Sequence, residues 1–212
     1  MTTLQLNKVL GKQIVNFEVF KILNRNNNNG INALVASIKR VYQGENSMYI
    51  EFESGRALEL DFNGGYTKYN RNGKVANKCS INTGIRLVEG HIQLKVEGRT
   101  ILIERLMAIC RDIINDKMPT SYEGLLANVM DGSGSVFTAS KLGIPVNYHP
   151  DNIEWCETSE NSVHGSMIMN MKKITGHVYR YSADDVILRI IFSKNDNDEL
   201  RNYCQNNLVR IK

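Results

Sequence analysis

Residues 48–62 alternate between apolar and mostly acidic side chains, and this pattern limits what the chain can fold into more than any other feature. Side chains of a strand point alternately to two faces, so such a run suits a sheet with one buried and one hydrated face. Ser54-Gly55 interrupts the run with residue types that favour a turn. We therefore predict a β-hairpin. Its apolar set is Met48, Ile50, Phe52, Leu58, Leu60 and Phe62, and its acidic set is Glu51, Glu53, Glu59 and Asp61.

Two further turns follow. An Asn-Gly pair at 72–73 favours a tight turn, and a Glu-Gly pair at 97–98 separates the alternating residues of 92–96 from those of 101–103. Apolar residues then recur at helical spacing over 106–114. The sequence predicts a second hairpin that runs directly into an amphipathic helix.

The N-terminal region carries another helical pattern. The polar run 24–30 is rich in asparagine and predicts a loop. The apolar residues of 31–41 fall at helical spacing, with Lys39 and Arg40 near the C-terminal end, where cations suit the helix dipole. Residues 1–23 fit a strand in one part and a helix in another, and both readings stay open.

The C-terminal region is mixed. Residues 184–192 fit either a helix or a buried strand, 196–205 predict a helix capped by Asn195 or Asp196, and 208–212 alternate like a strand. These patterns together predict an α+β fold, with N-terminal β-hairpins or a meander, short helices and a small α/β C-terminal tail.

Length and composition narrow the class of protein. The 212 residues can build one good-sized core or two small ones. There is no apolar run of about 18 residues and no secretory pattern at the N-terminus, so we expect a cytoplasmic protein with no membrane partner. The four cysteines are scattered without a C-x-x-C pair, which argues against a structural zinc site and favours free thiols.

The charge distribution is uneven although the net charge is only +4. Residues 1–41 and 163–181 are rich in cations, whereas 112–161 is acidic. Lysine and arginine supply most non-specific affinity for DNA because they neutralise phosphates. We predict that the protein binds DNA through these two cation-rich regions. The alternative interpretation is that the charges are ordinary solvated surface residues. The candidate DNA-binding residues are Lys39, Arg40, Lys172, Lys173 and Arg180.

Two segments of the acidic centre form an ordered motif. The first reads N-V-M-D-G over 128–132, and the second reads P-D-N-I-E-W over 150–155, followed by T-S-E-N over 158–161. Together they resemble the phage-type HNH homing endonucleases, in which N-H-x-D-G leads to P-x-N-L-x-W and a T-x-x-E-N helix. Upstream, 98–108 resembles that family's G-x-x-x-x-V-H-R-L-V-A segment, with Glu104 in place of the histidine.

The resemblance implies a ββα-metal module, a hairpin and a helix that hold one divalent cation, with Trp155 packing the helix on the hairpin. Asn128 and Asn152 match the metal-ligating positions, and Val129 stands at the general-base position, where the family carries histidine. Valine cannot accept a proton, so no catalytic residue is assigned. His149 is the possible substitute base. Two amide ligands imply no cofactor, or weakly bound Mg²⁺.

These interpretations divide the chain into an N-terminal α+β region (1–84), an HNH-like module (85–168) and a C-terminal region (169–212). The first functional hypothesis is a DNA-binding or accessory phage-type protein on a catalytically degenerate scaffold, with a protein partner in a phage or host complex as a further possibility. The second is an active divalent-metal-dependent endonuclease with an atypical site. A third is an unrelated α+β protein in which 150–155 only begins a capped helix.

Overall fold

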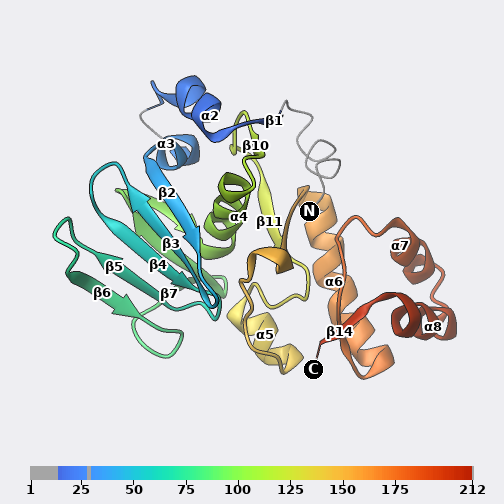
Figure 1. Ribbon diagram of the computed structural model, residues 1–212. Helices are drawn as coiled ribbons and strands as arrows, with labels where there is room; N and C mark the ends of the chain where they lie inside the picture. The colour runs from blue at the N-terminus through green and yellow to red at the C-terminus, as the bar shows by residue number, and fades with distance from the viewer. Residues whose placement is uncertain (1–13, 28–29, 212) are drawn as a thin grey trace.

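The computed structural model describes residues 14–27 and 30–211. Its largest sheet is a five-stranded antiparallel meander in the order β2-β3-β4-β5-β6 (Figure 1). The predicted hairpin is confirmed, because Met48 pairs with Leu60 and Ile50 with Leu58, and all four side chains are buried. The strands are β2 (Ile38–Gln43), β3 (Ser47–Phe52), β4 (Ala57–Asp61), β5 (Tyr66–Tyr69) and β6 (Val75–Cys79).

The second predicted hairpin and the helix after it are also confirmed. Strands β7 (Arg86–Val88), β8 (His91–Val96) and β9 (Arg99–Leu102) form a three-stranded sheet, and α4 (Ile103–Ile114) begins at the residue after β9. Figure 1 shows α4 between the meander and strand β11, and α4 contacts both β2 and β11. Its Leu106, Met107 and Ile109 are fully buried, so α4 is the centre of the main core.

The N-terminal helices differ from the prediction. Helix α2 (Phe17–Asn24) is capped by Asn16, and α3 (Gly30–Ala36) ends before the sheet begins. The helix predicted over 31–41 is therefore too long, and Lys39 and Arg40 lie on β2 instead of at a helix end. The β-branched Ile38 and Val41 pair with Phe52 and Ile50, and this ladder outweighs the helical spacing. The ambiguous pattern of 1–13 lies outside the described residues.

The second half of the chain is built around another antiparallel pair. Strand β11 (Leu126–Val129) pairs with β12 (Ile153–Cys156), and α6 (Thr158–Thr175) follows β12 after one residue. Helix α5 (Val136–Leu142) and the 3₁₀ turn η1 (Pro150–Asn152) lie in the long connection between the strands. The motif P-D-N-I-E-W thus forms a short 3₁₀ turn, which contains Asn152, and a strand, and the α-helix of this region begins only at Thr158.

The C-terminal region packs on the far side of α6. Strands β13 (Val178–Arg180) and β14 (Val209–Ile211) pair antiparallel, and α7 (Val186–Ser193) and α8 (Asn197–Asn207) lie between them in sequence. For 184–192 the sequence left a helix or a buried strand open, and the structure shows a helix that is capped by Asp185. The predicted helix with an Asp196 cap and the final strand are confirmed. Near the N-terminus, β1 (Ile14–Val15) pairs with β10 (Met118–Pro119).

The architecture is α+β, as predicted. Two hydrophobic clusters lie under it: a main core that reaches from Phe20 to Trp155, and a second core around α6, α7 and α8, with Ile144 packed against both. All four cysteines are buried and free. Among the described residues, no helix combines the length and apolar character needed to cross a bilayer.

Candidate functional site

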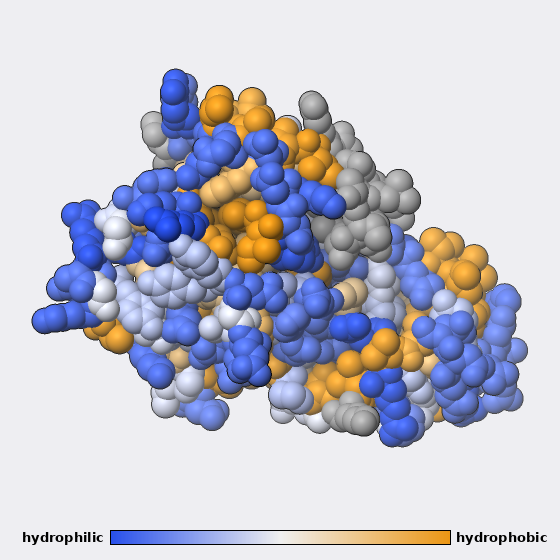
Figure 2. Space-filling view, viewed as in Figure 1, coloured by the Kyte–Doolittle hydropathy of each residue, from blue (hydrophilic) through white to orange (hydrophobic). Residues whose placement is uncertain are grey.

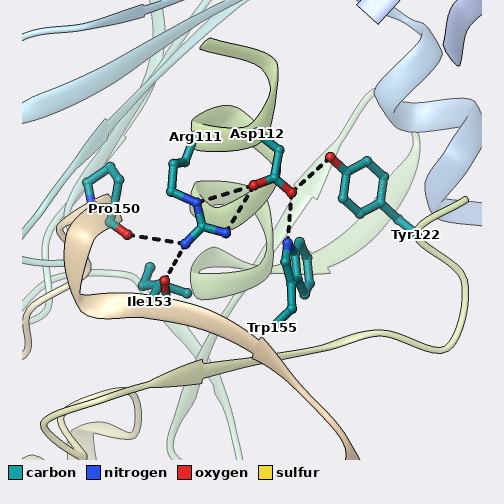
Figure 3. Close-up of polar contacts among 6 residues, drawn as sticks. All are labelled: Arg111, Asp112, Tyr122, Pro150, Ile153 and Trp155. Carbon is teal, nitrogen blue, oxygen red and sulfur yellow. Dashed lines mark hydrogen bonds and ion pairs between the residues drawn. The ribbon is translucent and has the colours of Figure 1, made fainter. Parts of the chain in front are cut away.

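The turn and strand that the P-D-N-I-E-W motif forms are held to α4 by a buried polar network (Figure 3). One oxygen of Asp112, Oδ2, accepts hydrogen bonds from Trp155 Nε1 at 2.7 Å and from the Tyr122 hydroxyl at 3.2 Å. Its other oxygen, Oδ1, accepts from Nη2 of Arg111 at 3.0 Å. Arg111 Nη1 donates to the carbonyls of Ile153 and Pro150. The network therefore fixes the start of β12 and the indole of Trp155.

Burial dominates the electrostatics of this network. Asp112 is 3% exposed, and burial raises the pKa of its carboxyl, although Arg111 and the hydrogen bonds from Trp155 and Tyr122 act in the opposite direction. A carboxylate in such a place is stable only while all its partners remain. The resemblance implied that Trp155 packs a helix onto the hairpin; in the structure it anchors the hairpin to α4.

Asn128, the first predicted metal ligand, is engaged within the protein. Its Nδ2 donates to Glu154 Oε1 at 2.8 Å, across the β11–β12 pair. The same carboxyl accepts from the Ala183 amide at 2.6 Å and from the Ser182 hydroxyl. Burial raises the pKa of Glu154, and these hydrogen bonds oppose that shift. The cluster joins the β11–β12 pair to the segment before α7.

Asn152, the second predicted ligand, is sealed inside the fold. It is 1% exposed, its Nδ2 donates to the Asn147 carbonyl at 2.9 Å, and its Oδ1 is buried without a hydrogen-bond partner. Among the described residues, no group of three or more His, Cys, Asp or Glu side chains is placed to hold a metal. Magnesium prefers an octahedral oxygen shell with carboxylates and waters. A single buried amide oxygen that belongs to no such group does not fit that requirement.

Val129, at the general-base position, and His149, its suggested substitute, both have roles in packing or capping. Val129 is 4% exposed and belongs to the main core, where a Cβ added at Gly134 would meet its side chain. His149 Nδ1 accepts from the Asp151 amide at 3.2 Å and so caps η1. Its ring packs edge-on against Phe62, with the centroids 4.8 Å apart. His149 is thus a cap and a packing group.

A different imidazole lies beside β11. A pocket of about 150 Å³, which we call the Glu104 pocket, opens between α4, β11 and α6. His91 Nδ1 lies 2.7 Å from Glu104 Oε1, and the second oxygen of Glu104 is buried without a partner. The hydrogen bond to Glu104 raises the pKa of His91, and one to the Gly134 backbone adds to the shift. The polar lining residues are His91, Glu104, Asn128, Ser135, Thr138, Asn161 and His164.

His164 also lines the Glu104 pocket but serves the packing of α6. Its Nε2 hydrogen-bonds the Met130 carbonyl at 3.1 Å, and its ring lies on that of Tyr181 with the centroids 4.5 Å apart. Burial lowers the pKa of His164 to about 4, so the ring is neutral near pH 7. The sequence reasoning did not single out the pair of His91 and Glu104, because only the pairing of β8 with β9 brings strand and helix together.

The predicted DNA-binding residues lie on three elements, β2, α6 and β13. Lys39 and Arg40 lie on β2, where Arg40 pairs with Glu51 at 3.3 Å. Lys172 Nζ donates to the carbonyls of Lys141 and Leu142, so it caps the end of α5. The remaining two, Lys173 on α6 and Arg180 on β13, are exposed and half-buried respectively.

A comparison of this chain with protein families, curated proteins and solved structures found no match.

Proposed function

We propose that this protein is a DNA-binding or accessory module on an HNH-like scaffold that does not cleave DNA. The order β11, β12, α6 is the strand-strand-helix order that the motif resemblance implies. The resemblance also suggests a phage-encoded protein that acts in the host cytoplasm, with a protein partner in a phage or host complex as a further possibility.

The observation that carries the proposal is the burial of Val129 in the main core at the general-base position. Attack of water on a phosphodiester needs a base or a metal to activate the water. The amide groups of Asn128 and Asn152 make internal hydrogen bonds, and Asn152 is closed to solvent. A protein with this centre keeps a scaffold and loses the means to activate water.

The test is incubation of the protein with supercoiled plasmid and Mg²⁺ or Mn²⁺, together with a measurement of DNA affinity at several salt concentrations. We expect no nicking, and affinity that falls steeply as salt rises, because phosphate contacts release counterions. Nicking that Asn152→Ala abolishes and Lys173→Ala preserves would refute the non-cleaving proposal. A flat salt response would refute the DNA-binding part and favour a protein partner.

The second candidate function is a metal-dependent endonuclease with an atypical site. The Glu104 pocket favours it, because His91 and Glu104 line the same pocket as Asn128 and Asn161. Against it, His91 Nδ1 is already hydrogen-bonded to Glu104 Oε1 at 2.7 Å, so this nitrogen is not free to take a proton from water. If this candidate were right, His91→Ala and Glu104→Gln would each remove nicking activity from a protein that nicks plasmid.

A further inference from the structure

The open face of the meander plays no part in the site above. Side chains of β3 and β4 alternate, and the buried set packs in the main core with α4, so the other set points away from that core. Figure 2 shows a pale, weakly polar patch over the part of the meander that contains β3, β4 and β5. The strand register places three tyrosines and three acids on this face, which we call the Tyr49 face. They are Tyr42, Tyr49, Tyr69, Glu51, Glu59 and Asp61.

The three tyrosines form a row from β2 to β5. The ring centroids of Tyr42 and Tyr49 are 6.3 Å apart, and those of Tyr49 and Tyr69 are 6.0 Å apart. The rings of Tyr49 and Tyr69 meet across β4 because Tyr69 is paired there with Ala57, whose side chain is a single methyl group. Tyr42 is 46% exposed, and the other two tyrosines are half-buried. The row therefore presents aromatic surface to solvent.

Arg40 shows how this face holds a guanidinium group. Its Nη1 donates to the Tyr42 hydroxyl at 3.1 Å, and its Nε lies 3.3 Å from Glu51 Oε2. A second tyrosine and carboxylate, Tyr49 and Glu59, lie directly opposite each other on β3 and β4. They offer the same kinds of group, an aromatic ring and a carboxylate, to a guanidinium from outside the chain.

The negative charge around Glu59 is only partly compensated. Its Oε2 accepts from the Tyr69 hydroxyl at 2.8 Å, and its Oε1 accepts from the Ser47 hydroxyl at 3.2 Å. In the part of the chain that the structure describes, neither Glu59 nor Asp61 forms an ion pair. Burial raises the pKa of Asp61 and the charge of Glu59 adds to the shift, while Lys78 on the same face acts in the opposite direction. This part of the Tyr49 face therefore suits a cation.

A guanidinium on a protein segment is the ligand chemistry that fits best. It can lie flat on an aromatic ring and hydrogen-bond a carboxylate at the same time. A nucleic acid is disfavoured, because its phosphates would meet Glu51, Glu59 and Asp61. A second copy of this chain in a two-fold contact is disfavoured as well, because the same three acids would face each other. Tyrosine and arginine are also the residue types that contribute most to protein interfaces.

We propose that the Tyr49 face binds an arginine-bearing segment of a protein partner, with the guanidinium against the ring of Tyr49 and hydrogen-bonded to Glu59. The carboxyl of Asp61 adds to the field that attracts the cation. This inference adds the surface and the chemistry of a protein partner to the proposed function, and it holds whether or not the protein binds DNA.

The test is a titration of the isotope-labelled protein with a short glycine-arginine peptide, in which the amide resonances are followed by NMR. The comparison peptides carry lysine, or uncharged citrulline, in place of arginine. We expect the amides of β3, β4 and β5 to shift. The arginine peptide should bind about threefold more tightly than the lysine peptide, because only guanidinium combines stacking with a planar hydrogen-bonding fork. The citrulline peptide should not bind.

Two variants test the named contacts. Glu59→Gln keeps an acceptor oxygen for the Tyr69 hydroxyl but removes the charge, and should weaken binding of the arginine peptide about three- to fivefold. Tyr49→Val keeps a residue type that suits a strand but removes the ring, and should cause a loss of about threefold. The matched control is Glu18→Gln, an exposed acid on α2, which should leave the affinity unchanged.

The inference is overturned if the arginine peptide does not bind, if it binds no better than the citrulline peptide, or if the amide shifts fall on other elements. It is also overturned if both variants bind as the wild type does. Shifts of the same amides by oligothymidine would identify a nucleic acid as the occupant instead, and dimerisation that Glu59→Gln abolishes would identify a second copy. None of these outcomes alters the result of the plasmid test, so the proposed function is judged separately.

Discussion

Asp112 shows how one buried carboxyl organises a large part of the molecule. It receives hydrogen bonds from a helix neighbour, from the loop tyrosine Tyr122 and from Trp155 on β12. Partners so far apart in sequence meet only in the folded state, so these hydrogen bonds stabilise one placement of α4 relative to β12. Arg111, which is 7% exposed, depends on the same carboxyl for its counter-charge.

We expect Asp112→Asn to lower the free energy of unfolding by about 3–5 kcal/mol, because it leaves the Arg111 guanidinium buried without a counter-charge. Urea denaturation followed by circular dichroism measures the loss. Asp151→Asn is the matched control, since the Asp151 side chain is 80% exposed, and its effect should stay within about 0.5 kcal/mol. Equal effects of the two substitutions would contradict the assigned role of Asp112.

Two histidines give stability opposite dependences on pH. Burial lowers the pKa of His164 from 6.5 to about 4, so its contribution is complete above pH 6.5 and is lost as pH falls towards 4. At about 1.36 kcal/mol per pKa unit, the loss is about 3 kcal/mol. His91 has a raised pKa, so its contribution is complete below pH 6.5 and is lost as pH rises through the folded-state pKa.

We therefore expect the free energy of unfolding to have a local maximum near pH 6.5, measured by urea denaturation at a series of pH values. His164→Gln should flatten the acidic side of the profile and His91→Gln the alkaline side. A profile whose acidic side is unchanged by His164→Gln would show that other groups cause the acid sensitivity.

At the scale of elements, β11, β12 and α6 are joined by close approaches rather than by charge alone. The turn after β11 contacts α6 at Gly132. The backbone φ of Gly132 is +76, and a Cβ added to this residue would lie 2.6 Å from Ile168 Cδ1. Glycine meets both demands at once, because it adopts positive φ freely and has no side chain. The motif's D-G pair is therefore explained by packing.

We expect Gly132→Ala to destabilise the protein by about 2–4 kcal/mol, from backbone strain together with overpacking against Ile168. Gly73→Ala is the matched control, because Gly73 has φ +74 but nothing within 4 Å of an added Cβ. It should cost only the strain, about 1 kcal/mol. Thermal unfolding of both variants measures the difference. Equal losses of stability would mean that Ile168 can move aside without destabilising the protein.

At the scale of the whole molecule, two hydrophobic cores are connected by polar contacts. Glu154 on β12 accepts from Ser182 and Ala183, and the Met130 carbonyl accepts from the Tyr181 amide at 3.3 Å. These bonds run from the main core to the segment that leads into the second core. We infer that the two cores are stable only together.

The two cores contain buried cysteines that report on them separately, Cys110 in the main core and Cys204 in the second, each 0% exposed. We expect both thiols to become reactive at the same urea concentration, because breaking one core exposes polar groups of the other. Pulsed thiol labelling with peptide mapping measures each midpoint. An earlier midpoint for Cys204 would show that the second core unfolds alone.

The sequence by itself determined the local elements. Alternation gave the hairpins of β3–β4 and β8–β9, and apolar spacing gave α4, because each of these patterns is complete within a few consecutive residues. The same reasoning made the helix at 31–41 too long, because the pairing of Ile38 with Phe52 belongs to the sheet and cannot be seen in the local spacing.

Only the tertiary structure decided which polar groups are free to act. The sequence singled out Asn128, Asn152 and His149, and folding gives each an internal partner: Glu154, Asn147 and Asp151. It also brings His91 to Glu104 and Lys68 to the Lys95 carbonyl. Hydrogen bonding and burial depend on neighbours that are distant along the chain, and a pattern of residue types does not contain that information.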